Sequence, residues 1–191
     1  EGIVRAVRGV DFEVDQNQVL GIVGESGCGK SVTARAVLNV LASNSEVMDG
    51  QVLYNKEENI TDLLKLDKDG KEIRKLRGKE ISMIFQEPMT SFSPVHTIGN
   101  QIMEAILLHT DLDKKAAREK AINTLKEVGI QEAESRIDDY PYQLSGGMRQ
   151  RAMIAMALSC EPNLLLADEP STALDVTIQA QILDLMMDMK D

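Results

Sequence analysis

Residues Gly24 to Ser31 form a pattern that could bind phosphate groups. The spacing is Gly-x4-Gly-Lys-Ser, between an apolar run and a segment of helical character. In such a loop the glycines let backbone N–H groups turn inward around phosphates, and the N-terminus of the next helix adds partial positive charge. The contacts would come from Gly24, Glu25, Ser26, Gly27, Cys28, Gly29, Lys30 and Ser31. The alternative, a glycine turn that binds nothing, is disfavoured by the full match and its context.

The last two residues of this loop carry distinct chemistry. Lys30 would reach the β- and γ-phosphates, where its charge also counts as catalytic in a closed site. The Ser31 hydroxyl would ligate Mg²⁺. The pattern therefore predicts a nucleoside triphosphate with its magnesium ion.

Two adjacent carboxylates, Asp168 and Glu169, follow the apolar run Leu164 to Ala167. A buried strand rarely ends in such a pair unless a cation or a proton is handled there. Asp168 would hold the magnesium shell, partly through water, and Glu169 would polarise the attacking water as a general base. The alternative is an acidic turn that caps the next segment. The presence of a phosphate loop in the same chain disfavours this alternative.

A glutamine, Gln86, follows a third apolar run, Ile81 to Phe85. In an α/β sheet this is the edge where ligands bind. Its neutral amide could touch Mg²⁺ or the nucleophilic water without competing for charge. The alternative is a polar residue that starts a loop, and spacing alone does not decide between the two.

Ser145, Gly146 and Gly147 precede a segment of helical character. Ser145 could be a plain helix N-cap. The two glycines go further, because they expose backbone N–H groups and permit close approach by an anion. Since the phosphate loop already surrounds one nucleotide, this second anion-binding surface would serve the nucleotide of another copy.

These residues need an α/β framework to position them. Residues 3–14 alternate apolar and polar side chains, which predicts antiparallel edge strands, and residues 19–24 predict a buried strand. Further strands are expected at 51–55, 81–85 and 163–168, with a charged insertion and a short helix at 56–80. Helices are expected from near Lys30 to residue 41 and over 97–129, 145–159 and 176–189. Ala117, Ala121, Leu125 and Val128 recur at helical spacing, and Gly129 supplies a stop.

Composition excludes some functions. A net charge of −10 and 3% aromatic residues without tryptophan argue against a nucleic-acid-binding surface. There is no secretory signal at the start and no apolar run long enough to span a membrane. Cys28 and Cys160 lack the spacing of a disulfide framework or a metal site. Cys28 fits a position that needs a small side chain; the alternative is a thiol activated by the helix N-terminus.

Together these residues resemble the ATP-binding cassette (ABC) family over nearly the whole chain. Residues Gly24 to Ser31 are similar to Walker A, Gln86 to the Q-loop glutamine and Leu144 to Gln150 to the signature. Residues Leu164 to Glu169 are similar to Walker B with its catalytic glutamate, and Ser171 to Asp175 to the D-loop.

A finer resemblance is to the dipeptide, oligopeptide and nickel importer ATPases. It rests on the stretches FQEPMTSFSPVHTIGNQI and YPYQLSGGMRQRAMIAMALSCEPNLLLADEPSTALDVTIQAQIL. The resemblance implies a P-loop NTPase core with a parallel central sheet, an N-terminal antiparallel β-subdomain and an inserted helical signature subdomain. One cassette would span 1–191, with the core at 1–95 and 161–191 and the helical subdomain at 96–160.

The resemblance also implies partners. Two cassettes, identical or related, would sandwich each ATP between Walker A of one copy and Ser145 and Gly147 of the other, with Gly146 and Asp175 beside them. Transmembrane permease subunits would dock in a groove involving Glu87 to Val95 and the helical subdomain, with a solute-binding protein acting indirectly and no nucleic acid involved. The subunit would sit peripherally at the cytoplasmic face of the membrane and power peptide or nickel import.

Two departures from the family pattern affect the expected activity. The family's switch histidine lies beyond the D-loop helix, and the chain reaches Asp191 without it. His96 is expected in a loop and His109 near a helix C-terminus, where a cation is favoured. No aromatic residue precedes Phe12 to stack on adenine. The chain therefore resembles a fragment trimmed at both ends, expected to bind ATP weakly and to turn it over poorly.

Two other functions compete with the importer ATPase. A soluble cassette protein of DNA repair or translation usually inserts a long coiled coil or carries two cassettes, and the short helical block and lack of basic clusters disfavour it. A nucleotide-binding module without catalysis would act as a dimerisation switch. Glu169 argues against this function for the parent protein, but the truncation leaves it open for the fragment.

Overall fold

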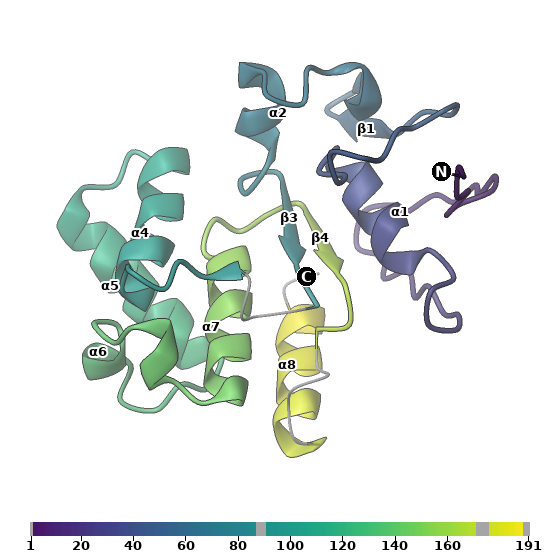
Figure 1. Cartoon of the computed structure of the whole chain (residues 1–191). Helices are drawn as coiled ribbons and strands as arrows, with labels where there is room; N and C mark the ends of the chain where they lie inside the picture. Colours follow the sequence, from purple (N-terminus) through teal and green to yellow (C-terminus); the bar gives the residue numbers. More distant parts are fainter. Residues whose placement is uncertain (1, 87–90, 171–175, 189–191) are drawn as a thin grey trace. The chain divides into compact units, whose positions relative to one another are not determined.

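The computed structural model describes residues 2–86, 91–170 and 176–188; for Thr177, Ile178, Ile182, Leu185 and Asp188 it describes the backbone alone. The chain divides into two compact units, residues 1–77 and residues 78–191 (Figure 1). Each unit is described by itself.

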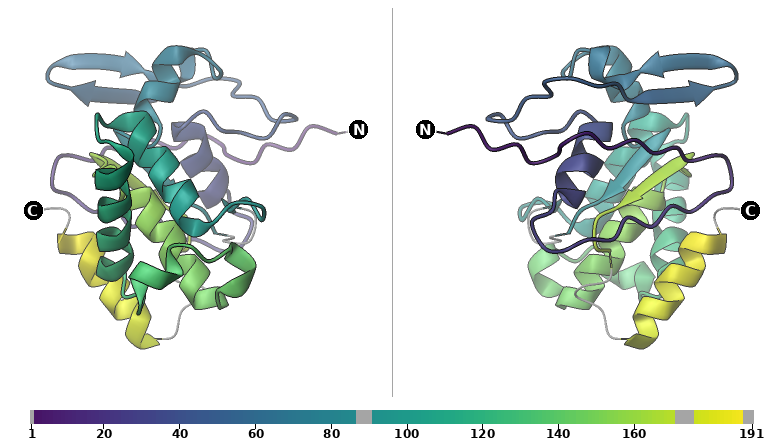
Figure 2. Two further views of the ribbon diagram at one scale, coloured as in Figure 1. Left: turned by 90° about the vertical axis from the view of Figure 1, so that its left-hand side faces the viewer. Right: turned by 90° about the vertical axis from the view of Figure 1, so that its right-hand side faces the viewer.

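The first unit contains helix α1 (Lys30–Val37), strands β1 (Leu53–Lys56) and β2 (Asn59–Asp62), the short 3-10 helix η1 (Leu63–Lys65) and helix α2 (Lys71–Leu76). The two strands form an antiparallel hairpin, which Figure 2 shows as two arrows side by side. Glu57 and Glu58 make its turn, both with positive φ, as a two-residue hairpin loop requires. The strand predicted at 51–55 and the short helix predicted within 56–80 are confirmed, and β2 is a strand that the sequence does not predict.

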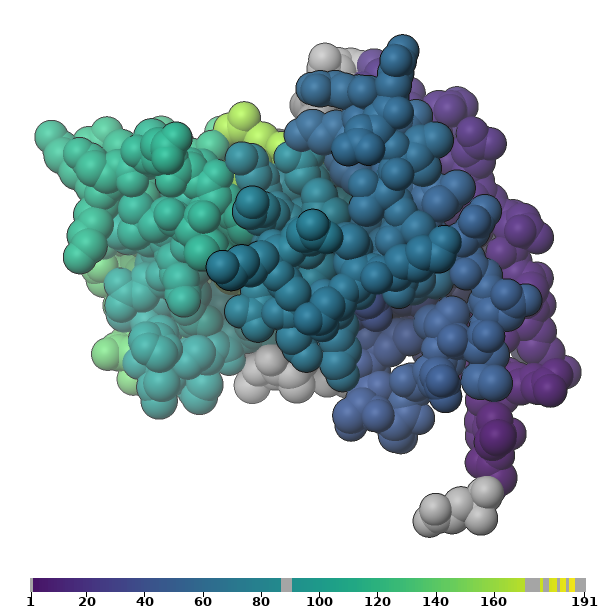
Figure 3. All heavy atoms as spheres, turned by 90° about the horizontal axis from the view of Figure 1, so that it is seen from above, coloured from purple at the N-terminus to yellow at the C-terminus, as the bar shows by residue number. Residues whose placement is uncertain are grey.

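The prediction of strands at residues 3–14 and 19–24 is wrong for this structure. Both segments have irregular backbone, and their apolar side chains are exposed, with Val23 at 96%. The N-terminal residues, purple in Figure 3, form part of the visible surface. A central strand needs hydrogen-bonding neighbours, and in the described part of this unit β1 and β2 pair with each other. The antiparallel element of the N-terminal part is therefore this hairpin.

Helix α1 begins at Lys30 as predicted but is shorter than expected. It ends at Val37, and Asn39 follows with φ 53° while its N–H donates to the Ala36 carbonyl. Asparagine tolerates this left-handed conformation better than most residues. The apolar pattern that continues to residue 41 therefore does not extend the helix.

The second unit is built on a parallel pair of strands, β3 (Ile81–Ile84) and β4 (Leu164–Ala167). Between them run α4 (Ile98–His109), α5 (Lys114–Glu127), α6 (Ala133–Arg136), η2 (Pro141–Gln143) and α7 (Gly146–Leu158); α8 (Val176–Asp188) follows β4. The α/β class with parallel strands is confirmed. Strand β3 is fully buried as expected, but β4 is only half-buried, since β3 is its one partner among the described residues.

The core of the second unit lies among α4, α5 and α7. Figure 1 shows these helices grouped together, and the turned views of Figure 2 agree that they cover one face of the β3–β4 pair. Ala117, Ala121, Leu125 and Val128 are all buried, which confirms the predicted face, and Gly129 ends the helical segment with φ 75°. The single helical block expected over 97–129 is broken by a turn before Asp113, whose carboxylate caps α5.

Helix α4 is fixed at its N-terminus by the segment after α6. The N–H of Ile98 donates to the Asp139 carbonyl at 2.9 Å, and that of Gly99 to the Ile137 carbonyl at 2.7 Å. A Cβ on Gly99 would lie 2.7 Å from that same oxygen. Glycine is therefore required by the close approach, and it lets two otherwise unpaired helix donors be satisfied.

Candidate functional site

The loop Gly24 to Ser31 has a shape set by its glycines. Gly27 and Gly29 take φ values of 82° and 103°, which other residues rarely adopt. A Cβ on Gly29 would also lie 2.8 Å from the Ala6 carbonyl oxygen. Gly29 is the N-cap of α1, so Lys30 and Ser31 form its first turn. Gly29 offers no capping side chain to this turn, and the N-terminus of a helix is a place where an anion is favoured.

The Lys30 side chain folds back over its own loop. Its ammonium donates to the carbonyl of Gly24 at 2.8 Å and to that of Glu25 at 3.0 Å. These bonds hold one positive charge at the place where the glycines turn the backbone. Residues 24–28 are exposed, and Lys30 and Ser31 are half-buried. The loop is therefore exposed and carries one lysine at its C-terminal end, and its binding of phosphate stays a prediction.

Asp168 and Glu169 lie at the carboxyl end of β4. The Asp168 N–H donates to the Ile84 carbonyl at 2.9 Å, which continues the β3–β4 pairing by one residue. The Asp168 side chain is buried, whereas Glu169 is exposed. Glu169 has φ 50°, in the left-handed region that a glutamate seldom occupies. Such conformations concentrate at functional sites.

Gln86 meets Glu169 at this edge. Its amide Nε2 donates to the Glu169 Oε2 at 2.9 Å, although 83 residues separate the two. The parallel register explains the meeting, because Gln86 and Glu169 both lie two residues beyond the paired ends of their strands, Ile84 and Ala167. The structure thus brings together two of the predicted site residues beside a third, Asp168. Their catalytic and metal-binding roles stay predictions.

For the segment Ser145 to Gly147, the structure confirms the N-cap interpretation, and the contact with the nucleotide of another copy stays a prediction. Ser145 is the N-cap of α7, and its hydroxyl accepts from the Met148 N–H at 3.3 Å. Gly146 has no atom within 4 Å of the position where a Cβ would lie. Neither packing nor a positive φ in the described chain therefore requires a glycine there.

One residue that the sequence analysis did not single out belongs with these. Gln150, on α7, is fully buried, and its Nε2 donates to the Pro170 carbonyl at 2.7 Å. Pro170 directly follows Glu169. One feature of the sequence could have indicated Gln150. It is a polar residue that precedes the apolar run Ala152 to Ala155 by two positions, and those residues are buried in α7.

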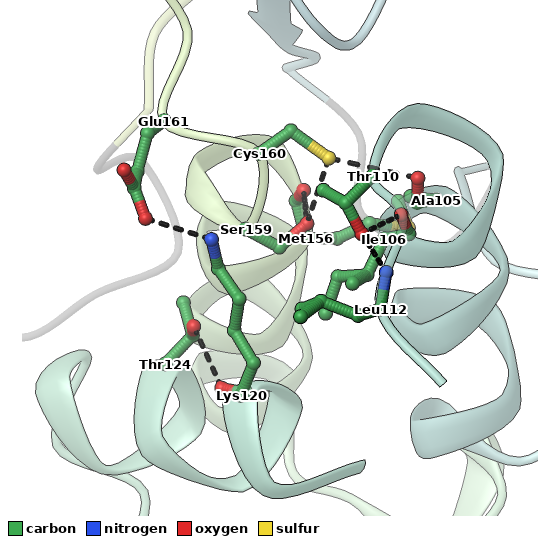
Figure 4. Close-up of polar contacts among 10 residues, drawn as sticks. All are labelled: Ala105, Ile106, Thr110, Leu112, Lys120, Thr124, Met156, Ser159, Cys160 and Glu161. Atoms are coloured by element: carbon green, nitrogen blue, oxygen red, sulfur yellow. Dashed lines mark hydrogen bonds and ion pairs between the residues drawn. The ribbon is translucent and has the colours of Figure 1, made fainter. Parts of the chain in front are cut away.

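Cys28 belongs to the loop Gly24 to Ser31, whereas Cys160 and the two histidines lie elsewhere in the sequence. Cys160 is half-buried, donates to the Ala105 carbonyl and lies beside Ser159 (Figure 4). Burial raises the pKa of its thiol. Cys28 is exposed. His96 lies in a loop as predicted, with its Nδ1 2.8 Å from the Ser93 hydroxyl.

His109 lies at the end of α4 as predicted, but the expectation of a favoured cation is wrong. Burial and the positive charge of Lys79 lower the pKa of its imidazole. Desolvation therefore exceeds the attraction of the helix C-terminus.

Some predicted residues cannot be placed. Asp175 and the rest of the segment Ser171 to Asp175 lie outside the described residues, and so do residues 87–90 of the predicted docking groove. Within the described chain, no helix is long and apolar enough to cross a membrane.

Known proteins are similar to this chain in sequence and in fold. A family model described as ABC transporter matches residues 7–172. A probable peptide ABC transporter ATP-binding protein of Sinorhizobium fredii, y4tR, is 53% identical over 100% of this chain and 56% of its own length. The dipeptide transport ATP-binding protein DppD of Bacillus subtilis is 51% identical over 99% of this chain and 55% of its own length.

The chain thus spans about half the length of the curated relatives it matches. Among solved structures, a dimeric post-hydrolysis state of the ATP-binding cassette MJ0796, bound to ADP and Pi, superposes with a TM-score of 0.85 at 26% identity. That match covers 97% of this chain and 75% of the cassette. Because the family model covers most of its residues, this chain belongs to the ABC transporter family.

Proposed function

We propose that this chain is the nucleotide-binding part of an ATPase subunit that powers an ABC importer for peptides. Family membership and the peptide-transport names of its relatives support the class. The observation that carries the catalytic part is the contact between Gln86 and Glu169 beside the buried Asp168. Nickel is the alternative cargo for this subfamily.

Glu169 is the general base in this proposal. It takes a proton from water while the water oxygen attacks the γ-phosphorus of ATP, and the bond from that phosphorus to the β-γ bridging oxygen breaks to give ADP and phosphate. Gln86 holds the Glu169 carboxylate and orients the water. Lys30 and the loop Gly24 to Ser31 bind the phosphates.

The proposed metal ligands suit Mg²⁺. Ser31, Asp168 and Gln86 offer hydroxyl, carboxylate and amide oxygens, the hard donors that this ion prefers. When bound, Mg²⁺ would neutralise charge on the phosphates. Ser31 belongs to the first unit and the other two residues to the second, so the assignment of all three to one ion rests on the family.

The proposal includes a second ATPase subunit, identical or related. Ser145, Gly146 and Gly147 would contact the nucleotide held by that subunit, with Asp175 near the junction. The free space around Gly146 supports such an approach. A dimeric cassette among the similar solved structures supports pairing.

Membrane permease subunits complete the proposed assembly. They would contact residues 87–95 and the helical subdomain, which we assign to residues 96–160, with the core at 1–95 and 161–191. A solute-binding protein would act through the permease. The subunit would lie at the cytoplasmic face of the membrane.

The substitution Glu169→Gln tests this function in the native full-length protein. We expect the ATP turnover number to fall about 10³-fold, because the general base is lost. ATP binding is retained, and an ATP-dependent dimer accumulates in light-scattering chromatography. Glu161→Gln is the matched control, since Glu161 is also exposed with φ 52° but lies in the turn after α7. Unchanged turnover in Glu169→Gln, or no ATP hydrolysis by the wild type, would refute the proposal.

A further inference from the structure

The backbone at Glu169 needs support from outside its own residue. Its φ of 50° lies in the left-handed region, where the Cβ of an L-residue crowds the following carbonyl. Such a conformation persists only when the surrounding structure holds it. The residues on each side of Glu169 show how this is done.

Both neighbours of Glu169 are anchored by hydrogen bonds. On the N-terminal side, the Asp168 N–H is bound to the Ile84 carbonyl of β3 at 2.9 Å. On the C-terminal side, the Pro170 carbonyl accepts from Gln150 of α7 at 2.7 Å. The first bond continues a strand ladder and needs no particular side chain. The second exists only because residue 150 carries a donor of the right length.

Packing does not account for a glutamine at position 150. The side chain is fully buried, close along α7 to Met153 and Ile154 of the core. Its Oε1 is buried and has no hydrogen-bond partner within the described part of the chain. Burial of such an oxygen is unfavourable, and an apolar side chain of similar shape would avoid it. The donor Nε2 is therefore the part of Gln150 that the site uses.

We propose that Gln150 is a positioning residue that holds Glu169 in its working conformation through the Pro170 carbonyl. The inference rests on the proposed role of Glu169 as the general base. In this role Gln150 acts through the backbone, at the Pro170 carbonyl. Ser145 is the N-cap of α7 and Gly146 its first residue. The same helix therefore carries two signature residues at its N-terminus and Gln150 about one turn later.

The variant Gln150→Met tests the anchor in the native full-length protein. Methionine keeps the length and shape of the side chain but cannot donate a hydrogen bond. We expect the turnover number to fall between about tenfold and 100-fold, because a small displacement of a catalytic group has effects of this size. The KM for ATP should stay within about twofold, since the phosphate loop is untouched.

Arg151→Met is the matched control. Arg151 is the next residue of α7, and it donates to the carbonyl of Gly129, in the turn after α5, at 2.6 Å. Arg151→Met removes a hydrogen bond from a side chain to a backbone carbonyl, as Gln150→Met does, but leaves the bond to the Pro170 carbonyl in place. Turnover should stay at the wild-type value even where the melting temperature falls.

The variant Gln150→Glu should make turnover depend on pH, an effect that a merely structural role of Gln150 would not produce. Burial raises the pKa of a carboxylic acid, and its protonated form has an O–H that can donate to Pro170. Turnover relative to wild type should therefore rise as the pH falls. Gln150→Met has no such donor, so its turnover relative to wild type should not change with pH.

A measurement independent of turnover completes the test. The backbone chemical shifts of Glu169, read by NMR without nucleotide, should leave their left-handed values in Gln150→Met. Unchanged shifts, or a turnover that falls equally in Arg151→Met, would overturn the positioning role. Absence of ATP hydrolysis in the wild type would instead refute the proposed function, and the chemical shifts would still decide the role of Gln150.

Discussion

The two units of this molecule hold their functional residues by different means. In the described part of the first unit, the buried apolar side chains are those of Leu38, Leu63 and Ile73. Residues 24–28 are exposed, and Lys30, two residues further on, bonds to carbonyls within six residues of itself. In the second unit, a core from three helices and a strand pair positions groups that are far apart in sequence.

The difference separates local from long-range positioning. The shape of the phosphate loop depends on glycine backbone angles, which a short segment can adopt with little packing. The meeting of Gln86 with Glu169 depends on the parallel register of β3 and β4, and hence on everything between them. Changes in the first unit should therefore affect ligand affinity, and changes in the second should affect stability and geometry.

Among the changes that test this difference between the units, Lys30→Met in the loop should have the largest effect. We expect the Kd for ATP to rise about 100-fold, because a charge-assisted contact to phosphate is lost. The melting temperature without nucleotide should hardly change, since Lys30 bonds only within its own loop in the contacts described. Isothermal titration and thermal unfolding measure the two quantities.

Lys71→Met is the control for that change, since Lys71 is an exposed lysine at the start of another helix of the same unit. It should leave ATP affinity at the wild-type value. A large loss of stability in Lys30→Met would break the distinction between local and long-range positioning.

The substitution Gly99→Ala should produce the next largest effect, in the second unit. A Cβ there would lie 2.4 Å from the Ile137 Cγ1 and 2.7 Å from the Ile137 carbonyl. We expect a loss of about 2 kcal/mol in the free energy of unfolding, measured with urea, because backbone must move. Gly146→Ala, also in the first turn of a helix, meets no atom within 4 Å and should cost no stability. Equal losses in both variants would contradict this view of the second unit.

The cysteines provide a smaller contrast between the units. Cys28 is exposed, whereas Cys160 is half-buried with a thiol pKa raised by burial. Iodoacetamide should therefore modify Cys28 about tenfold faster or more, as followed by mass spectrometry. ATP should protect Cys28 and leave Cys160 unaffected. Equal rates, or protection of Cys160 alone, would contradict the assignment of the phosphate loop.

The smallest effect concerns an ion pair on the surface of the second unit. Arg118 binds Asp138 through both guanidinium NH groups, at 2.9 and 2.7 Å, and lowers the pKa of that carboxyl. A lowered folded pKa means that the stabilisation exists above the unfolded pKa, about 4, and disappears as the pH falls through the folded value. Because the Asp138 side chain is exposed and that of Arg118 is only half-buried, water weakens the ion pair, and Asp138→Asn should cost less than about 0.5 kcal/mol at pH 7.

The difference in stability between wild type and Asp138→Asn should shrink below about pH 4. The control is the same comparison of Asp138 with asparagine in an Arg118→Met background, where the ion pair is absent and this trend should be lost. A difference that grew on acidification would contradict the direction of the pKa change.

Residues near in sequence were the most predictable part of the site. The loop Gly24 to Ser31, the start of α1 at Lys30 and the N-cap role of Ser145 follow from local spacing, and the structure places each as expected. Apolar patterns also located β3, β4, α5 and α7. Local patterns misled at residues 3–14 and 19–24, because a strand depends on partners that its own residues do not encode.

By itself, the sequence determined which chemical groups this protein carries: a phosphate loop, an acidic pair and a glycine-rich helix start. These groups can be recognised from residue types and spacing because each is formed by residues close together in the sequence. Only the tertiary structure decided that Gln86 reaches Glu169, and that Gln150 holds Pro170. These contacts join residues 83 and 20 positions apart. They depend on strand register and on packing of the helical core, which no local pattern specifies.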